Sequence, residues 1–140
     1  MKEQIHRRDL VFNLDYMSLG QFSVGDENER YDDCVIQEKK LGYAISVRKG
    51  VVSNISIYLF GESYGFSQYS GVIKNNGKIC YWNESTPVCL IKKTLGLFDD
   101  HWNDGVEENI QFVLGKYRIE FSWNVDNDSP RLEYISVELD

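Results

Sequence analysis

Two similar stretches decide the fold of this chain: LGYAISV (41–47) followed by VSNISIYL (52–59), and LGKYRIEF (114–121) followed by LEYISVEL (132–139). Each stretch alternates apolar and polar residues on either side of a polar turn, which predicts a pair of antiparallel strands. A pattern that recurs in both halves of a chain indicates one supersecondary unit used twice, with neighbouring copies sharing a core. The sequence therefore predicts one continuous antiparallel sheet built from two quasi-repeated units.

The length and composition indicate one folded domain over residues 1–140. A chain of 140 residues with 42% hydrophobic residues can bury a core without disulfides or metals. We expect the first unit at about 9–60, an exposed connection rich in Gly, Ser and Tyr at 61–71, and the second unit at about 72–140. The three cysteines form no C-x-x-C pair, and neither a membrane-spanning run nor a signal-peptide core is recognisable. We therefore expect a cytoplasmic protein without structural disulfides.

Local signals place the remaining elements and predict an α+β fold, with one or two short helices packed on one face of the sheet. Thr86 and Pro87 open a helix at about 87–95 that Gly96 ends, and Asp26 is a possible cap for a short helix or turn at 25–31. Asn76-Gly77 predicts the turn of a hairpin. The expected strands are 9–14, 34–38, 42–48, 51–60, 72–74, 78–82, 109–114, 116–124 and 131–139.

Alternation within the strands predicts which side chains face the core. In 116–124, Tyr117, Ile119, Phe121 and Trp123 share one face, whereas Arg118, Glu120 and Ser122 share the other. The residues expected to face inward in the matching strands are Ile45, Val47, Ile55, Ile57, Ile135 and Val137. Those expected to face outward are Ser46, Arg48, Asn54, Ser56, Tyr58, Tyr134, Ser136 and Glu138. The outer face is thus predicted to be rich in Ser and Tyr.

The net charge of -7 argues against direct nucleic-acid binding, because phosphate backbones are bound mainly by Lys and Arg. An acidic surface either attracts a basic protein partner, through complementary fields that accelerate association, or only maintains solubility. Composition alone leaves both readings open.

Several short motifs resemble those of small bacterial immunity proteins of polymorphic-toxin and contact-dependent inhibition systems. They are YSGVI (69–73), GKI (77–79), STP (85–87), LG (95–96) and YRIEF (117–121), which span about the last seventy residues. The order of helix, Leu-Gly and antiparallel strands also resembles the repeat module of the β-lactamase inhibitor protein family. This resemblance implies a concave, Tyr-rich sheet face that grips an enzyme. The first unit lacks a counterpart of the helix, and the β-lactamase inhibitors are secreted and disulfide-bonded, so inhibition of β-lactamase is not carried over.

The sequence offers a binding surface more readily than a catalytic centre. His6 and His101 are the two histidines, and no spacing pairs His101 with a nucleophile or with metal ligands. We expect no enzymatic activity, no cofactor and no metal site. The acidic segment 99–108 is either a solvated loop or a partner-binding loop, and the aromatic residues at 64–69 either dock a partner or fold back onto the sheet. The candidate partner-binding residues are Asp99, Asp100, His101, Trp102, Asp104, Tyr58, Tyr134, Glu120, Tyr64 and Tyr69.

Taken together, these features predict a cytoplasmic immunity protein that neutralises a cognate bacterial toxin by steric and electrostatic occlusion. A toxin with a basic active-site cleft, such as a nuclease, would suit the acidic surface. We expect a monomer or weak dimer that binds neither nucleic acid nor membrane. Two alternatives remain: a small-ligand-binding or enzymatic domain with a pocket between sheet and helix, and an oligomerising structural module that uses exposed sheet edges.

Overall fold

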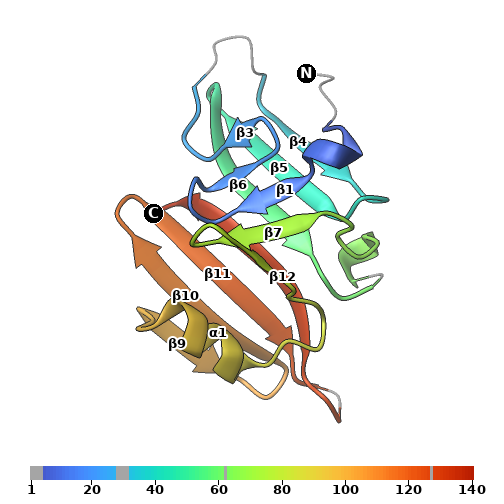
Figure 1. Cartoon of the computed structure of the whole chain (residues 1–140), viewed down its shortest axis with the longest axis vertical. Helices are drawn as coiled ribbons and strands as arrows, with labels where there is room; N and C mark the ends of the chain where they lie inside the picture. The colour runs from blue at the N-terminus through green and yellow to red at the C-terminus, as the bar shows by residue number, and fades with distance from the viewer. Residues whose placement is uncertain (1–4, 28–31, 62, 127) are drawn as a thin grey trace.

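A computed structural model of the chain describes residues 5–27, 32–61, 63–126 and 128–140 (Figure 1). Its main element is a large antiparallel sheet of seven strands, in the order β4-β5-β6-β12-β11-β10-β9. Along the chain these strands are β4 (Cys34–Glu38), β5 (Tyr43–Arg48), β6 (Val51–Tyr58), β9 (Asp100–Asn103), β10 (Glu107–Leu114), β11 (Tyr117–Asn124) and β12 (Arg131–Leu139). The predicted continuous sheet is therefore confirmed.

A second, smaller sheet and one α-helix cover a single face of the large sheet. The small sheet has the order β3-β2-β1-β7-β8, with β1 and β7 parallel. Its strands are β1 (Val11–Asn13), β2 (Ser18–Leu19), β3 (Phe22–Ser23), β7 (Val72–Asn75) and β8 (Lys78–Cys80), and the helix is α1 (Val88–Leu95). Short 3-10 turns lie at η1 (Arg7–Asp9) and η2 (Ser63–Gly65). The α+β prediction holds, but the small sheet was not predicted as a separate layer.

The two repeated hairpins, β5-β6 and β11-β12, meet at the centre of the large sheet. β6 pairs with β12 in a register that puts Ser56 opposite Ser136, 80 residues away. The order of buried and half-buried side chains along β6 is the same as along β12. The pairing register also shifts at matching places, after Ser46 in β5 and after Ser122 in β11. The hairpins are thus related by a local two-fold axis that passes between Ser56 and Ser136.

The two Leu-Gly pairs that flank the repeated hairpins do not occupy equivalent positions. A Cβ at Gly42 would lie 2.5 Å from main-chain atoms of Ser67 and Tyr69, whereas a Cβ at Gly115 would meet none of the described residues within 4 Å. Both glycines have positive φ, which favours glycine at each turn. The similarity of these dipeptides therefore reflects two different requirements, close approach of a neighbouring segment at Gly42 and a tight hairpin turn at Gly115.

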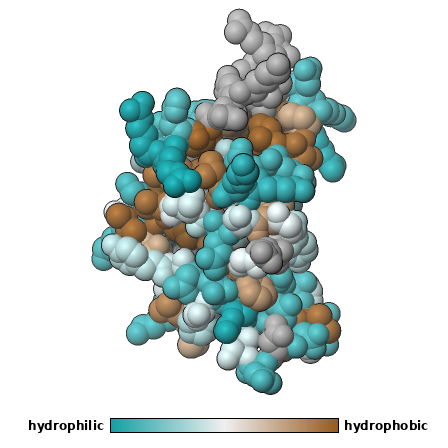
Figure 2. All heavy atoms as spheres, turned by 90° about the vertical axis from the view of Figure 1, so that its right-hand side faces the viewer, coloured by the Kyte–Doolittle hydropathy of each residue, from teal (hydrophilic) through white to brown (hydrophobic). Residues whose placement is uncertain are grey.

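The core lies between the large sheet and its covering layer. All six residues predicted to face inward are buried, and so are Ile119, Phe121 and Trp123. In the second unit α1 contributes Ile91 to the core, whereas in the first unit Phe12, Phe22 and their neighbours in the small sheet join the same contiguous cluster. The apolar face of the first unit is therefore covered by the small sheet instead of a helix (Figure 1). On the flank shown in Figure 2, apolar side chains are visible mainly in the upper half.

The connection 61–71 contributes to the core, although the sequence predicts an exposed segment. Phe66 and Tyr69 are buried, with exposed fractions of 3% and 9%. The amide of Tyr69 donates to the carbonyl of Tyr58 at 2.7 Å, and the amide of Ser67 donates to the carbonyl of Lys39 at 2.8 Å. These hydrogen bonds hold the connection against the β4-β5 turn and the end of β6, which allows two of its rings to become buried.

The predicted hairpin and helix are present with small differences. Asn76 and Gly77 have φ values of 55° and 71°, as the Asn-Gly turn requires. The helix runs from Val88 to Leu95 and ends at Gly96, but the Thr86 hydroxyl accepts a hydrogen bond from the Asn83 amide instead of capping the helix. The short helix or turn expected at 25–31 lies partly outside the described residues. Among the described residues, no helix is long and apolar enough to cross a membrane.

Candidate functional site

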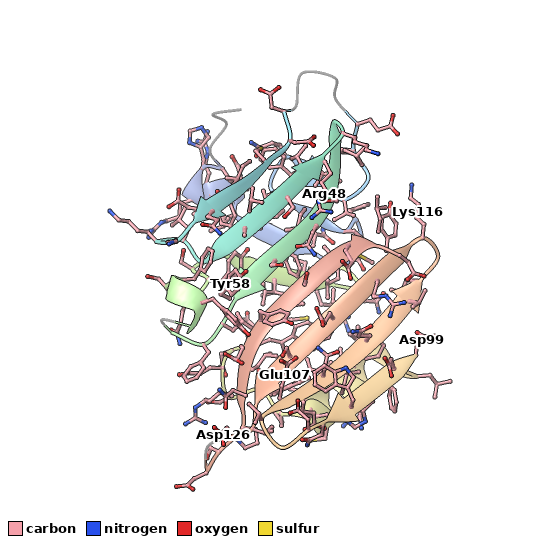
Figure 3. The ribbon with its side chains drawn as sticks, turned by 180° about the vertical axis from the view of Figure 1, so that it is seen from behind. Arg48, Tyr58, Asp99, Glu107, Lys116 and Asp126 are labelled. Atoms are coloured by element: carbon pink, nitrogen blue, oxygen red, sulfur yellow. The ribbon has the colours of Figure 1, made fainter. Side chains whose placement is uncertain are left out.

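The large sheet has one face that neither the small sheet nor α1 covers, and we call it the outer face (Figure 3). Residues paired across antiparallel strands project to the same side of a sheet, so the register defines which side chains share this face. One row across the outer face runs through Trp102, Asn109, Ser122, Tyr134 and Tyr58. The next row runs through Asp100, Gln111, Glu120, Ser136, Ser56 and Ala44.

These rows bring together five of the candidate residues, Asp100, Trp102, Glu120, Tyr134 and Tyr58. They come from four different strands, so only the pairing of the large sheet makes them neighbours. Trp102 and Asp100 lie on β9, because the segment predicted as an acidic loop forms an edge strand at Asp100–Asn103. Trp102 is 40% exposed.

Tyr64 joins this face from η2, at the end of β6. Its ring lies 6.0 Å from that of Tyr134 in an edge-on arrangement and 5.9 Å from that of Tyr58. Tyr58 in turn stacks on Phe66 with a centroid distance of 4.1 Å and an interplanar angle of 11°. Phe66 is buried, whereas Tyr64 remains 60% exposed. Aromatic pairs in such geometries stabilise each other beyond simple burial, so the three tyrosines form a supported cluster.

A depression of about 310 Å³ opens within this cluster. Its lining residues are Ser56, Tyr58, Tyr64, Glu120, Tyr134 and Ser136, and we call it the tyrosine pocket. The two serines are buried, and their hydroxyl oxygens lie 3.0 Å apart on the two-fold axis. The side-chain nitrogen of Asn54, Nδ2, donates to the Ser136 hydroxyl at 2.9 Å. These hydrogen bonds connect β6 to β12 beneath the pocket.

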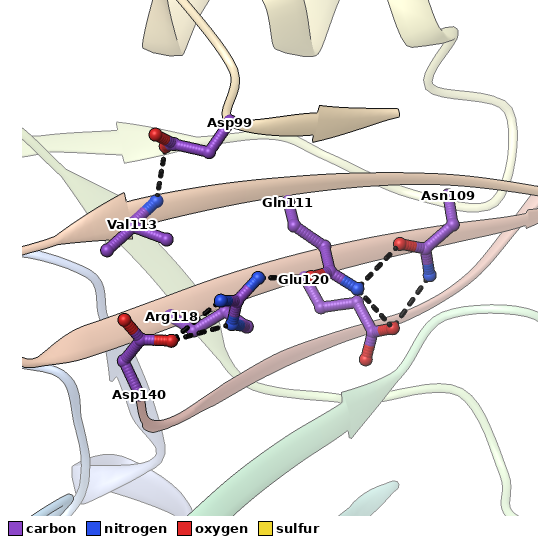
Figure 4. A network of polar contacts seen from close by, with 7 residues as sticks. All are labelled: Asp99, Asn109, Gln111, Val113, Arg118, Glu120 and Asp140. Carbon is purple, nitrogen blue, oxygen red and sulfur yellow. Dashed lines mark hydrogen bonds and ion pairs between the residues drawn. The ribbon is translucent and has the colours of Figure 1, made fainter. Parts of the chain in front are cut away.

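Glu120 is held in place by a network of amides and charges (Figure 4). Its Oε2 accepts hydrogen bonds from Asn109 Nδ2 at 2.7 Å and from Gln111 Nε2 at 3.4 Å. The Arg118 guanidinium donates to Gln111 Oε1 and pairs with Asp140 at 2.7 Å. The positive charge of Arg118 is thus already paired with a carboxylate, and the carboxylate of Glu120 is oriented by neutral amides.

Negative charge surrounds the tyrosines. Burial raises the pKa of Tyr64, and the charges of Glu133, Glu107 and Glu120 raise it further. Burial also raises the pKa of Tyr134, where Glu120 and Glu107 act in the same direction. In both cases burial is the largest cause of the raised pKa, and the nearby carboxylates add to it.

Four other candidate residues lie away from the pocket. His101 pairs with Ile110 and so projects to the covered side of β9, where its Nε2 lies 2.7 Å from Glu108 Oε2. Tyr69 is buried, with its hydroxyl 2.8 Å from the Val72 carbonyl. An edge strand alternates its side chains between the two faces, which is why His101 is separated from its neighbours Asp100 and Trp102.

Asp99 and Asp104 lie at the two ends of β9 and bind main-chain amides. Asp99 accepts from the Val113 amide at 2.7 Å. Asp104 accepts from the amides of Glu107 and Val106 at 2.8 Å and 2.9 Å, and these hydrogen bonds lower the pKa of Asp104. Asp104 therefore stabilises the turn between β9 and β10, and Asp99 joins the start of β9 to the end of β10.

Sequence reasoning missed Glu107, Asn109 and Gln111, which support the pocket from β10. Their spacing of two residues was the available signal, because it places all three on one face of a strand. Strand 109–114 was predicted, but its register against Glu120 depends on pairing with β11.

A pocket between sheet and helix, as one alternative requires, is present as a depression of about 510 Å³. It is lined mainly by apolar and aromatic side chains together with Asp15 and Asn75, and His101 is not among its described lining residues. The Asp15 carboxylate accepts hydrogen bonds from the amides of Asn76 and Gly77. Within the described ranges, no group of three or more His, Cys, Asp or Glu side chains is placed to hold a metal ion.

Comparisons of the chain with protein-family models, with curated proteins and with solved structures gave no match.

Proposed function

We propose that this protein is an immunity protein that binds a cognate bacterial toxin with its outer face and neutralises it by steric and electrostatic occlusion. One observation carries the proposal. The large sheet is covered on one face by the small sheet and α1, while its other face presents tyrosines, a tryptophan and carboxylates to solvent (Figure 3).

The composition of the outer face suits protein recognition. Tyr and Trp provide large contact areas at low entropic cost, and serine hydroxyls between them form adaptable hydrogen bonds. Tyr58 stacks on the buried ring of Phe66 and contacts the rings of Tyr64 and Tyr134, so little ordering is needed when a partner binds. This arrangement favours a preformed binding face.

The charge of the outer face favours a basic partner. Asp100, Glu107 and Glu120 lie on or beside it, and the chain as a whole carries a net charge of -7. Complementary charge accelerates encounter and disfavours acidic partners. A toxin with a basic active-site cleft, such as a nuclease, fits these requirements, and occlusion requires no chemistry from the inhibitor.

The first test is whether the gene immediately upstream encodes a toxin domain, and the proposal expects one there. Co-expression of the two chains is expected to preserve cell growth, and the purified chains are expected to form a 1:1 complex by light scattering. Trp102→Ala and Tyr134→Ala are expected to weaken the complex at least tenfold in calorimetry. Tyr81→Ala is the matched control, because Tyr81 is 85% exposed and follows β8 in the covering layer.

Two outcomes would count against the proposal. Absence of a toxin domain beside the gene, or failure of this protein to protect against it, would remove the immunity function. Equal affinity of the Trp102, Tyr134 and Tyr81 variants would place the toxin on another surface. The electrostatic part is tested by Asp100→Lys with Glu107→Lys, which should slow association and flatten its dependence on salt.

A further inference from the structure

The local two-fold axis provides an internal comparison for the tyrosine pocket. Rotation about the axis places Asn54 where Tyr134 lies and Glu138 where Tyr58 lies, as the pairing of β6 with β12 shows. A second depression of about 370 Å³ lies at this position, and Ser46, Arg48, Ser53, Asn54, Glu138 and Leu139 line it. We call it the mate depression.

The two depressions differ in the chemistry of their walls. The tyrosine pocket has three aromatic rings and Glu120, whereas the described residues that line the mate depression include Arg48 but no aromatic side chain. Figure 3 shows Arg48 and Glu107 toward opposite ends of the outer face, with Tyr58 between them. The aromatic walls therefore lie on one side of the two-fold axis, with Tyr58 from the first unit and Tyr134 from the second, and they do not follow from the repeated strand pattern.

The walls of the tyrosine pocket match a planar cation. A guanidinium stacks on aromatic faces and pairs with a carboxylate through parallel hydrogen bonds. Within the described residues, both hydrogen bonds made by the Glu120 carboxylate involve Oε2, which leaves Oε1 for an incoming donor. The negative potential of Glu107 and Glu133 extends to Tyr64, the most exposed of the three rings.

We propose that the tyrosine pocket receives an arginine side chain of the protein partner, with its guanidinium stacked among Tyr58, Tyr64 and Tyr134 and paired with Glu120. This inference rests on the proposed function for the identity of the partner, but the pocket itself can be tested without any toxin. An arginine is favoured over a lysine because a guanidinium can stack on the tyrosine rings while it donates to Oε1 of Glu120, whereas an ammonium has no stacking plane.

The probe is a blocked tripeptide, acetyl-Gly-Arg-Gly-amide, titrated into the full chain. Nuclear magnetic resonance of the tyrosine rings is expected to show saturable millimolar binding, with shifts confined to the three pocket tyrosines. The same peptide with citrulline, which is neutral and nearly identical in shape, should bind at least tenfold more weakly. The lysine peptide should bind at least threefold more weakly than the arginine peptide.

Two pocket variants and one control make the test specific. Glu120→Gln should weaken arginine binding about tenfold, while Glu138→Gln in the mate depression should leave it unchanged. Tyr64→Gly should weaken binding about threefold to tenfold, and it suits the backbone because Tyr64 has a φ of 55°. Thermal unfolding of each variant shows whether the fold is retained.

Several results would overturn the inference. They are equal binding of the arginine and citrulline peptides, equal binding of the arginine and lysine peptides, shifts outside the pocket, or no effect of Glu120→Gln. If the native chain neutralises the toxin but does not bind the arginine peptide, only the arginine pocket is refuted. Peptide binding without toxin neutralisation would instead refute the proposed function alone.

Discussion

Replacement of Gly42 by alanine is expected to destabilise the fold far more than the same change at Gly115. Both residues have positive φ, at 80° and 62°, so each alanine pays about 1–2 kcal/mol for a left-handed conformation. At Gly115 no atom in the described part of the chain would lie within 4 Å of the new methyl group. At Gly42 the methyl group would lie 2.5 Å from Ser67 O and Tyr69 N, and main-chain atoms must move.

The additional cost at Gly42 follows from what these main-chain atoms do. Overpacking of a tight contact costs about 1–3 kcal/mol. The amide of Tyr69 bonds to the carbonyl of Tyr58 at 2.7 Å, and the loss of such a hydrogen bond costs about 1 kcal/mol more. We therefore expect Gly42→Ala to lower the free energy of unfolding by about 3–6 kcal/mol, and Gly115→Ala by about 1–2 kcal/mol.

Urea unfolding at neutral pH measures the difference directly. With a slope of about 2 kcal/mol per molar urea, the midpoints of the two variants should differ by about 1–2 M. Equal midpoints would refute the idea that Gly42 is required because the connection 61–71 docks on it. A further readout is the tyrosine pocket, because the same connection carries Tyr64, and Gly42→Ala should weaken peptide binding while Gly115→Ala should not.

Three further predictions concern single side chains. Trp123→Phe should lower the free energy of unfolding by about 2–4 kcal/mol in urea, because Trp123 is fully buried and its Nε1 donates to the Thr86 carbonyl at 2.8 Å; a loss below 1 kcal/mol would contradict this. Ser136→Ala should lower the free energy of unfolding by about 1 kcal/mol in the same assay, because Asn54 Nδ2 loses its acceptor. An unchanged midpoint would show that this hydrogen bond contributes nothing. Burial raises the pKa of Tyr69 above its ordinary value near 10, so the folded chain keeps a proton that the unfolded chain releases. The resulting stabilisation is fully present below pH 10 and decreases above it, and Tyr69→Phe should make the loss of unfolding free energy between pH 9 and 11 shallower than in the native chain.

Much of the local structure was predictable because it depends on residues close together in the chain. The alternation in β6 and β12 correctly identified the buried residues Ile55, Ile57, Ile135 and Val137, since successive side chains in a strand face opposite sides. Asn76-Gly77 correctly predicted a turn, and Gly96 correctly predicted the end of α1.

The small sheet and the buried connection could not be predicted in this way. β1 and β7 pair in parallel although about 60 residues separate them, as the pairing of Val11 with Val72 shows. Segment 66–69 reads as a polar connection, yet Phe66 and Tyr69 are buried because the β4-β5 turn offers main-chain partners. Parallel pairing and docking onto a turn leave no periodic signal within either segment.

In the candidate site too, some features follow from local sequence patterns and others from long-range strand pairing. The sequence by itself determined that Tyr58, Glu120 and Tyr134 face away from the core, because the period of a strand decides this within each segment. Only the tertiary structure decided that β6 lies beside β12, so that Tyr58 and Tyr134 share a pocket, and that β9 forms an edge strand that separates His101 from Trp102. The physical reason is that main-chain hydrogen bonds can join almost any two strands, so the choice of neighbour depends on how the whole apolar face is covered.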